Sequence, residues 1–120
     1  ARPLAPLLAE VDAIDSVDAL LATLGRLERR GVAGVVQLFV DNDPGDPERY
    51  LVFVEQDGIG LPDESYYRED AHADTRTAYR GHVERMLALA GLDDAGARAE
   101  RVIALETALA GHHWDKVRNR

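Results

Sequence analysis

The segment EQDGIGLPDESYY, residues 55–67, divides the sequence into two parts with different hydrophobic patterns. Before it lie two short runs rich in β-branched and aromatic residues, which favour strands. After it, apolar residues recur at helical spacing. The glycines and the proline within the segment disfavour regular secondary structure. We therefore expect a joint at which the chain passes from a β-hairpin to helices.

Each special residue of this joint has an expected task. Gly58 and Gly60 would supply backbone angles that a side chain disfavours, and Pro62 would end the extended run. Asp63 or Ser65 could cap a short helical turn. The last two residues, Tyr66 and Tyr67, would anchor that turn by burying their rings while their hydroxyls stay in water. The segment is thus predicted to be structural, with no ligand site.

The predicted hairpin pairs residues 35–40 with residues 50–54. Between these runs, residues 41–47 read DNDPGDP, a stretch dense in turn-forming and acidic residues. This stretch predicts a long acidic loop at the tip of the hairpin. We expect the tip to be mobile, because proline and glycine leave it few ladder hydrogen bonds.

Helices are expected on both sides of the hairpin. Apolar residues repeat at helical spacing in residues 4–14 and 17–27, with a break and a new N-cap at Asp15-Ser16 and a stop at Gly31. Residues 72–90 form the next helix, which Gly91 closes, and Asp93-Asp94 would cap the last one. The fold class is therefore mainly α with one β-hairpin, with a bundle-like arrangement of the helices.

Composition excludes several classes of function. The 120 residues carry a formal net charge of -8, which argues against nucleic acid as a partner. The absence of cysteine excludes disulfide scaffolds, thiolate zinc sites and cysteine nucleophiles. No apolar run has the roughly 20 residues that a membrane-spanning helix needs. The chain begins with Ala1 in place of methionine, so we expect its natural start to be missing, and its compartment, bacterial cytoplasmic or secreted, stays open.

The sequence contains no recognisable catalytic or metal motif. A zinc peptidase helix needs two histidines four residues apart, and His72, His82, His112 and His113 offer no such pair. Adjacent histidines point about 100° apart on a helix, so the last two are interpreted as polar residues at a helix end. Glu106 lies among apolar residues and is expected to be partly buried and hydrogen-bonded in a structural role. We predict no catalytic, cofactor-binding or metal-binding residue.

Three stretches, in order, carry a resemblance to a known family. They are QDGIGLPDESYY at residues 56–67, TAYRGHVERML at residues 77–87 and LETALA at residues 105–110. Together they resemble the non-catalytic helical region of the zinc metallopeptidases related to neprilysin and endothelin-converting enzyme. One departure is Gly-Ile-Gly at residues 58–60, where many members have Gly-Leu-Gly.

The resemblance implies a function for a larger protein. The chain would be a fragment, residues 1–120, of the N-terminal helical domain that forms a lid over the substrate cavity, with the catalytic domain absent. Zinc would belong to the parent enzyme, small peptides would be its substrates, and the rest of the peptidase would be the fragment's partner. Leucine and valine stripes left uncovered would favour self-association.

Two other functions compete with this one. A free-standing acidic helical protein-binding module, with no enzymatic activity, would use the same apolar surface. A small enzyme in its own right is disfavoured by the missing catalytic motifs. A His-Glu-x-x-His motif downstream in the parent reading frame would decide for the peptidase.

Overall fold

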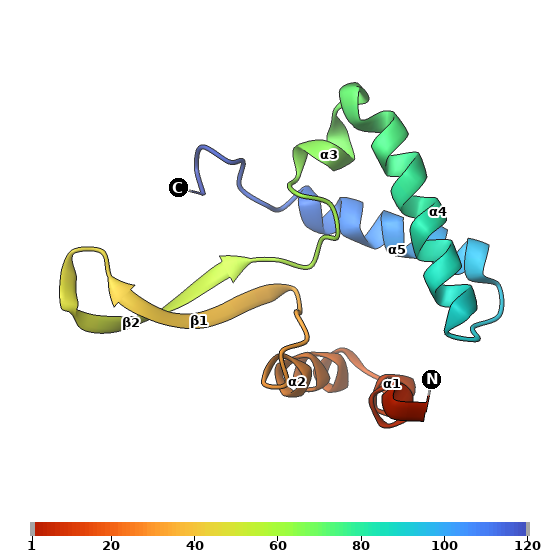
Figure 1. The fold of residues 1–120 in the computed structure, drawn as a ribbon, viewed down its shortest axis with the longest axis horizontal. Coiled ribbons are helices and arrows are strands. Elements are labelled where there is room, and N and C mark those ends of the chain that lie inside the picture. The colour runs from red at the N-terminus through yellow and green to blue at the C-terminus, as the bar shows by residue number, and fades with distance from the viewer. Residues whose placement is uncertain (1, 120) are drawn as a thin grey trace. The chain divides into compact units, whose positions relative to one another are not determined.

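The computed structural model describes residues 2–119, which form two compact units that divide after Gly58. We call residues 1–58 the hairpin unit and residues 59–120 the helix unit. Figure 1 shows the helices and the single hairpin that make up the two units. The predicted fold class, mainly α with one β-hairpin, is confirmed.

The hairpin unit begins with two helices. A 3-10 turn, Arg2–Leu4, leads into α1, Ala5–Asp12, and α2 follows at Val17–Glu28. The predicted break is confirmed, because Ser16 has extended backbone angles and its Oγ accepts a hydrogen bond from Ala19 N at 3.1 Å. Gly31 follows α2 with φ +82°, a left-handed conformation that suits glycine after a helix.

The hairpin itself joins β1, Val36–Asp43, to β2, Asp46–Gln56, in antiparallel register. Both predicted strands are confirmed, and both extend further than expected. The long loop predicted at residues 41–47 is wrong, because only Pro44 and Gly45 form the turn. The rings of Phe39 and Phe53 stack across the strands with centroids 5.3 Å apart.

Side-chain hydrogen bonds explain why the tip continues as strand. Asn42 pairs with Tyr50 and Asp43 with Asp46, so the residues between Asp46 and Tyr50 bulge out of the ladder, where Pro47 needs no N–H partner. Asn42 Nδ2 donates to the carbonyl oxygen of Pro47 at 2.6 Å, and Arg49 forms a 2.6 Å ion pair with Asp43. Mobility of the tip stays a prediction.

The helix unit contains two long helices that pack against each other, α4 at Ala73–Leu89 and α5 at Ala95–Ala110 (Figure 1). The short helix α3, Ser65–Arg68, and a 3-10 turn, Asp70–His72, precede them. Gly91, with φ +82°, follows α4 as predicted. The expected side-chain cap of α5 is wrong, because Asp94 instead takes a left-handed conformation with φ 54° and makes no capping hydrogen bond with its side chain.

A small core holds the helix unit together. Leu61, Tyr67 and Ala110 are buried in one cluster, and half-buried aromatic and aliphatic side chains pack around it. Ala99 of α5 is fully buried. Since the alanines are small, helix and loop backbones can approach each other closely here.

Candidate functional site

The predicted joint is present, but its two glycines serve different purposes. Gly58 has φ +90°, which confirms the expected backbone role. Gly60 does not have a positive φ. A Cβ atom at Gly60 would instead lie 1.9 Å from the hydroxyl oxygen of Tyr79, so glycine is required by the close approach of that ring. The predicted reason for Gly60 was therefore wrong.

The carboxylate of Glu106 organises the helix unit's part of the joint. Its Oε2 accepts a 2.5 Å hydrogen bond from the Tyr67 hydroxyl and a 3.1 Å bond from Gly60 N. Its Oε1 accepts a 3.0 Å bond from the Tyr79 hydroxyl. The carboxylate thus ties the loop, α3 and α4 to α5. The expected partly buried, hydrogen-bonded Glu106 is confirmed, and its oxygens are occupied as structural acceptors.

The hydroxyl of Tyr67 is a second centre of this cluster. It accepts hydrogen bonds from the backbone N–H groups of Gly60 and Leu61, both at 3.1 Å, while it donates to Glu106. The ring is buried, as predicted, but the expectation of a water-exposed hydroxyl is wrong. The backbone around Gly60 bends toward the ring and offers its own donors.

Burial and the Glu106 carboxylate raise the pKa of both Tyr67 and Tyr79. Burial, followed by the hydrogen bond to Glu106, raises the pKa of Tyr67 well above its usual range. The same causes raise the pKa of Tyr79 to about 12. Both hydroxyls therefore stay protonated donors at neutral pH, as the carboxylate requires.

A second acidic group fixes the start of α3. Asp63 Oδ1 accepts from Ser65 N at 2.9 Å and from Ser65 Oγ at 2.5 Å, while Oδ2 lies 2.7 Å from Lys116 Nζ. Burial of Asp63 acts to raise its pKa, but the bonds from Lys116 and Ser65 outweigh that effect and lower the pKa to about 2. Asp63 thus caps the turn that leads into α3, one residue before the N-cap of the helix, Glu64, whose own side chain makes no capping bond.

The histidines are spread over separate positions. His72 stacks on the ring of Tyr66 with centroids 3.9 Å apart, and His82 lies on α4. His112 and His113 follow the end of α5 in turns, where the sequence placed polar residues of a helix end. Residues 2–119 contain no group of three metal-ligating side chains. That none of these residues binds metal stays a prediction.

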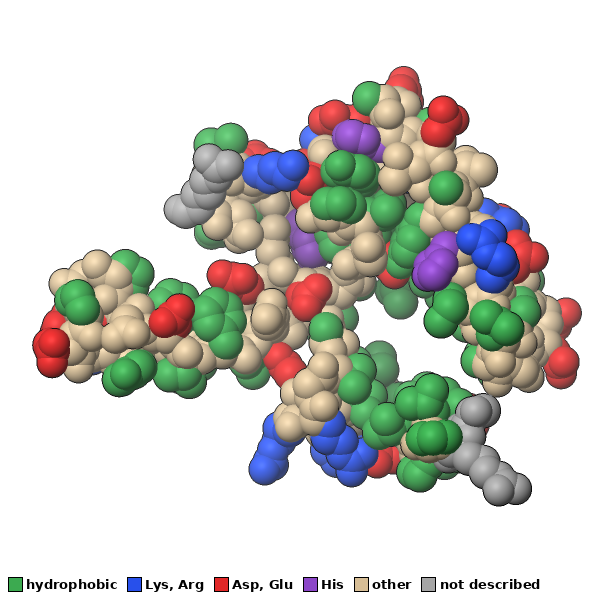
Figure 2. All heavy atoms as spheres, viewed as in Figure 1, with side chains coloured by type: hydrophobic (Ala, Val, Ile, Leu, Met, Phe, Trp, Pro, Cys, Tyr) green, Lys and Arg blue, Asp and Glu red, His purple; other side chains and the backbone are tan. Residues whose placement is uncertain are grey.

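The hairpin presents an apolar surface, visible in Figure 2 as hydrophobic side chains along the two strands. The register places alternate residues of both strands on one face. We call this set the valine face; its side chains are all more than a third exposed and belong to Val36, Leu38, Val40, Tyr50, Val52 and Val54. Large exposed apolar surfaces mark interaction sites.

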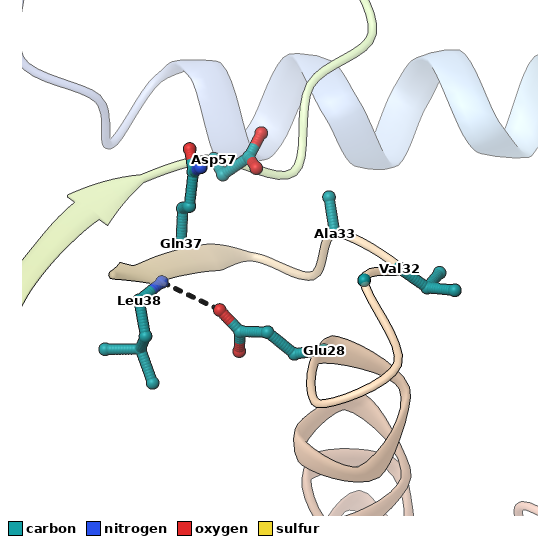
Figure 3. Close-up of a pocket in the computed structure, with 7 residues that line it drawn as sticks. Glu28, Val32, Ala33, Gln37, Leu38 and Asp57 are labelled. Atoms are coloured by element: carbon teal, nitrogen blue, oxygen red, sulfur yellow. Dashed lines mark hydrogen bonds between the residues drawn. The ribbon is translucent and has the colours of Figure 1, made fainter. Parts of the chain in front are cut away.

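A pocket of about 400 Å³ lies beside β1 in the hairpin unit. Figure 3 shows Glu28, from the end of α2, reaching the backbone of β1, where its Oε1 accepts from Leu38 N at 2.8 Å. Gln37, Val32 and Asp57 also line the pocket. A carboxylate that occupies a strand edge in this way hinders further pairing there.

Sequence reasoning missed the roles of Tyr79 and Glu28. Tyr79 was expected only to lie within a helix, but a tyrosine hydroxyl needs a partner when the side chain is half-buried. A glutamate near the end of a helix that precedes a hairpin can reach an unpaired backbone N–H, as Glu28 does, but no local pattern indicates it. No spacing rule connects Tyr79 with Glu106, because the contact spans the turn between two helices.

Comparison with known proteins identifies the family of this chain. Residues 1–120 match the N-terminal sequence model of peptidase family M13. The chain belongs to peptidase family M13. The predicted resemblance to neprilysin-type zinc metallopeptidases is thereby confirmed.

Solved structures of the family share this fold. The Mycobacterium tuberculosis zinc metalloprotease Zmp1 in complex with an inhibitor is 46% identical and superposes with a TM-score of 0.89 over 99% of this chain and 19% of its own. Zmp1 in its open state is 47% identical, with the same TM-score and the same coverage of both chains.

A curated relative matches over a shorter stretch. The endothelin-converting enzyme-like 1 of Rattus norvegicus is 31% identical over 80 residues, which are 65% of this chain and 10% of the relative. This M13 chain therefore spans about a tenth of that relative and about a fifth of the Zmp1 chain. Within residues 2–119, no helix is both long and apolar enough to cross a membrane.

Proposed function

We propose that this chain is a non-catalytic segment of the helical domain of an M13 zinc metallopeptidase, and that it helps to form the lid over the substrate cavity. The remainder of the peptidase would be its partner and would supply the zinc site. Small peptides would be the substrates of the whole enzyme. In this proposal the joint around Glu106 keeps the lid segment rigid.

The observation that carries the proposal is the match of the whole chain to the N-terminal model of the family. The chemistry of the residues supports it. Both oxygens of Glu106 accept hydrogen bonds from structural donors, and the sequence has no histidine pair at zinc-ligand spacing. A rigid frame with exposed apolar surface suits a part that packs against other chain segments.

Metal analysis and a peptidase assay test the first half of the proposal. After dialysis, the 120-residue chain should hold no stoichiometric zinc and should not cleave a fluorogenic peptide. One tightly bound zinc ion per chain, or peptide cleavage that a chelator abolishes, would overturn it.

The lid role requires the full-length protein. Glu106→Ala should loosen the joint and relax the size limit, so that longer peptides are cleaved relatively faster while the shortest ones are cleaved as before. Glu100→Ala, on the exposed part of α5, serves as the matched control. Rates that change in the same proportion for every peptide length, or not at all, would contradict the lid role.

The valine face also favours a second candidate, a free-standing protein-binding module. Such a module would bind a partner through this face with no attached catalytic domain. The reading frame distinguishes the two, because a downstream His-Glu-x-x-His motif belongs only to the peptidase.

A further inference from the structure

The last peptide bond of the hairpin unit joins Asp57 to Gly58, the single Asp-Gly pair of the sequence. Gly58 N donates a hydrogen bond to Asp57 Oδ1 at 2.8 Å. The carboxyl carbon Cγ is bonded to that oxygen, so the side chain is folded back toward the nitrogen of the next residue. Attack of this nitrogen on Cγ would close a cyclic imide, and a nucleophile already held beside its target reacts faster than a free one.

Glycine at position 58 removes the main steric obstacle to this attack. Its nitrogen has no neighbouring Cβ to shield it, and its φ of +90° lies in a region that residues with a side chain avoid. Asp57 itself lies just after the end of β2, so its carbonyl group is not held in the strand ladder. The backbone on both sides of the reacting atoms is therefore open to rotation.

Two other aspartates of the hairpin unit each lack one of these features. Asp43 bonds to the nitrogen two residues further on, Gly45 N at 2.8 Å, and its own next residue is a proline, which has no N–H. Asp41 makes the same contact as Asp57, because Asn42 N donates to Asp41 Oδ1 at 2.8 Å. Asn42 carries a side chain, however, and both residues lie within β1. Contact and glycine thus coincide at Asp57.

We propose that Asp57-Gly58 is a site of spontaneous covalent modification, at which Asp57 isomerises to isoaspartate. Gly58 N forms a bond to Cγ of the neutral carboxyl group, whose hydroxyl oxygen leaves as water with its own proton and that of the nitrogen. Water then adds to one of the imide carbonyls. Cleavage of the new bond restores aspartate, whereas cleavage of the original peptide bond leaves the main chain linked through Cγ. The net reaction gains and loses no atoms and needs no oxidant.

Water has access to the ring that this reaction forms. Asp57 is half-buried and lines the pocket of about 400 Å³ beside β1 (Figure 3). Hydrolysis of the imide requires a water molecule at its carbonyl carbons, which a fully buried site would exclude. The same pocket lets the water released in the first step leave.

The product changes the covalent link between the two units. Isoaspartate places Cβ in the main chain, so the link becomes one carbon atom longer, and the former main-chain carbonyl becomes a carboxylate side group. On one side of the added atom, Asp57 N donates to Val35 O at 3.2 Å. On the other side, Gly60 N is held by Tyr67 and Glu106. Isomerisation would therefore lengthen the joint between two anchored points.

Peptide mapping of the aged 120-residue chain tests the site. The folded chain is incubated in mildly acidic buffer, where part of the carboxyl groups is neutral, and is then digested. Electron-transfer fragmentation locates isoaspartate, because it detects the extra main-chain carbon. Asp57 should convert about tenfold faster than Asp41, which has the same contact but no following glycine. No isoaspartate at position 57, equal conversion of the two aspartates, or conversion only in urea would overturn the proposal.

Asparagine variants test the geometry at neutral pH without the need for a neutral carboxyl group. Asp57→Asn closes the same ring with loss of ammonia, so it should yield a mixture of aspartate and isoaspartate at position 57. Asp41→Asn is the matched control and should react about tenfold more slowly. Asp57→Glu keeps the charge but needs a larger ring, so its main chain should stay unaltered. Equal rates in the two asparagine variants would overturn the role of Gly58. This inference does not depend on the proposed function.

Discussion

The hairpin unit and the helix unit contain similar numbers of residues but are stabilised in different ways. In the described part of the hairpin unit, only Thr23 is buried, and most large apolar side chains are exposed. The helix unit buries a cluster of Leu61, Tyr67 and Ala110, as well as Ala99, and Tyr67 of the cluster donates a hydrogen bond to the Glu106 carboxylate. Strand pairing and local side-chain contacts hold the first unit together, whereas a small core with a polar anchor holds the second.

This difference indicates which interactions stabilise each unit. A hairpin without a covered face gains little from burial, so its stability depends on what covers the valine face. The helix unit contains its own partners, because its buried donors and acceptors satisfy one another. Substitutions should therefore affect the helix unit mainly through folding stability and the hairpin unit mainly through association or local opening.

The largest effect on the helix unit is expected from removing the Glu106 carboxylate, its polar anchor. Glu106→Leu should lower the free energy of unfolding by about 3 kcal/mol, since the hydroxyls of Tyr67 and Tyr79 and the N–H of Gly60 lose a charged acceptor. Urea denaturation measures this change. Glu100→Leu on the same helix should cost less than about 1 kcal/mol, because its ion pair with Arg80 is exposed. Equal losses of unfolding free energy in Glu106→Leu and Glu100→Leu would show that Glu106 does not anchor the helix unit.

A smaller effect is expected from adding one carbon atom at Gly60. Gly60→Ala places Cβ against the Tyr79 hydroxyl and should cost about 2 kcal/mol by displacing the ring. Gly25→Ala meets nothing within 4 Å in α2, so it should be neutral or stabilise by up to about 1 kcal/mol. Thermal unfolding of both variants tests the steric role. An unchanged melting temperature for Gly60→Ala would contradict it.

The helix unit should lose stability toward both extremes of pH. The pKa of Asp63 is lowered to about 2 in the folded chain, so its stabilising contribution is complete above its ordinary value of 3.8 and is lost as pH falls through 2. The pKa of Tyr79 is raised from 10.0 to about 12, so its contribution is complete below pH 10.0 and is lost as pH rises through 12.

A curve of unfolding free energy against pH measures both losses. We call the loss at low pH the acid limb and the loss at high pH the alkaline limb, and each is worth on the order of 1–2 kcal/mol. Asp63→Asn should flatten the acid limb and leave the alkaline limb unchanged. Tyr79→Phe should reduce the alkaline limb, to which Tyr67 also contributes, and leave the acid limb unchanged. Curves that both substitutions alter in the same way would argue against these two groups as the source of the limbs.

The smallest effect belongs to the hairpin unit and is local. Glu28→Ala frees the N–H of Leu38 from its 2.8 Å bond and should speed amide hydrogen exchange at Leu38, with a change in global stability below about 1 kcal/mol. Glu48→Ala provides the control, because Glu48 is a glutamate of β2 near the tip, away in sequence from Leu38 and its register partner Val54. Unchanged exchange at Leu38 would show that Glu28 does not protect this edge.

Local patterns in the sequence determined most elements of both units. The helices, the Ser16 cap, the strands and the stops at Gly31 and Gly91 follow from residue type and short-range spacing, which depend on neighbouring residues. The partly buried Glu106 was also predictable, because an acidic residue inside an apolar stripe needs partners. Family membership followed from three ordered stretches in the second half of the chain.

Only the tertiary structure decided which distant groups meet. Gly60, Tyr67 and Tyr79 come from three separate segments to meet Glu106 of α5, and no local rule encodes that convergence. The same holds for Gly60, whose missing side chain makes room for Tyr79, and for Glu28, which reaches the edge of β1. The physical reason is that burial and hydrogen bonding depend on three-dimensional proximity, whereas propensity depends on the adjacent chain.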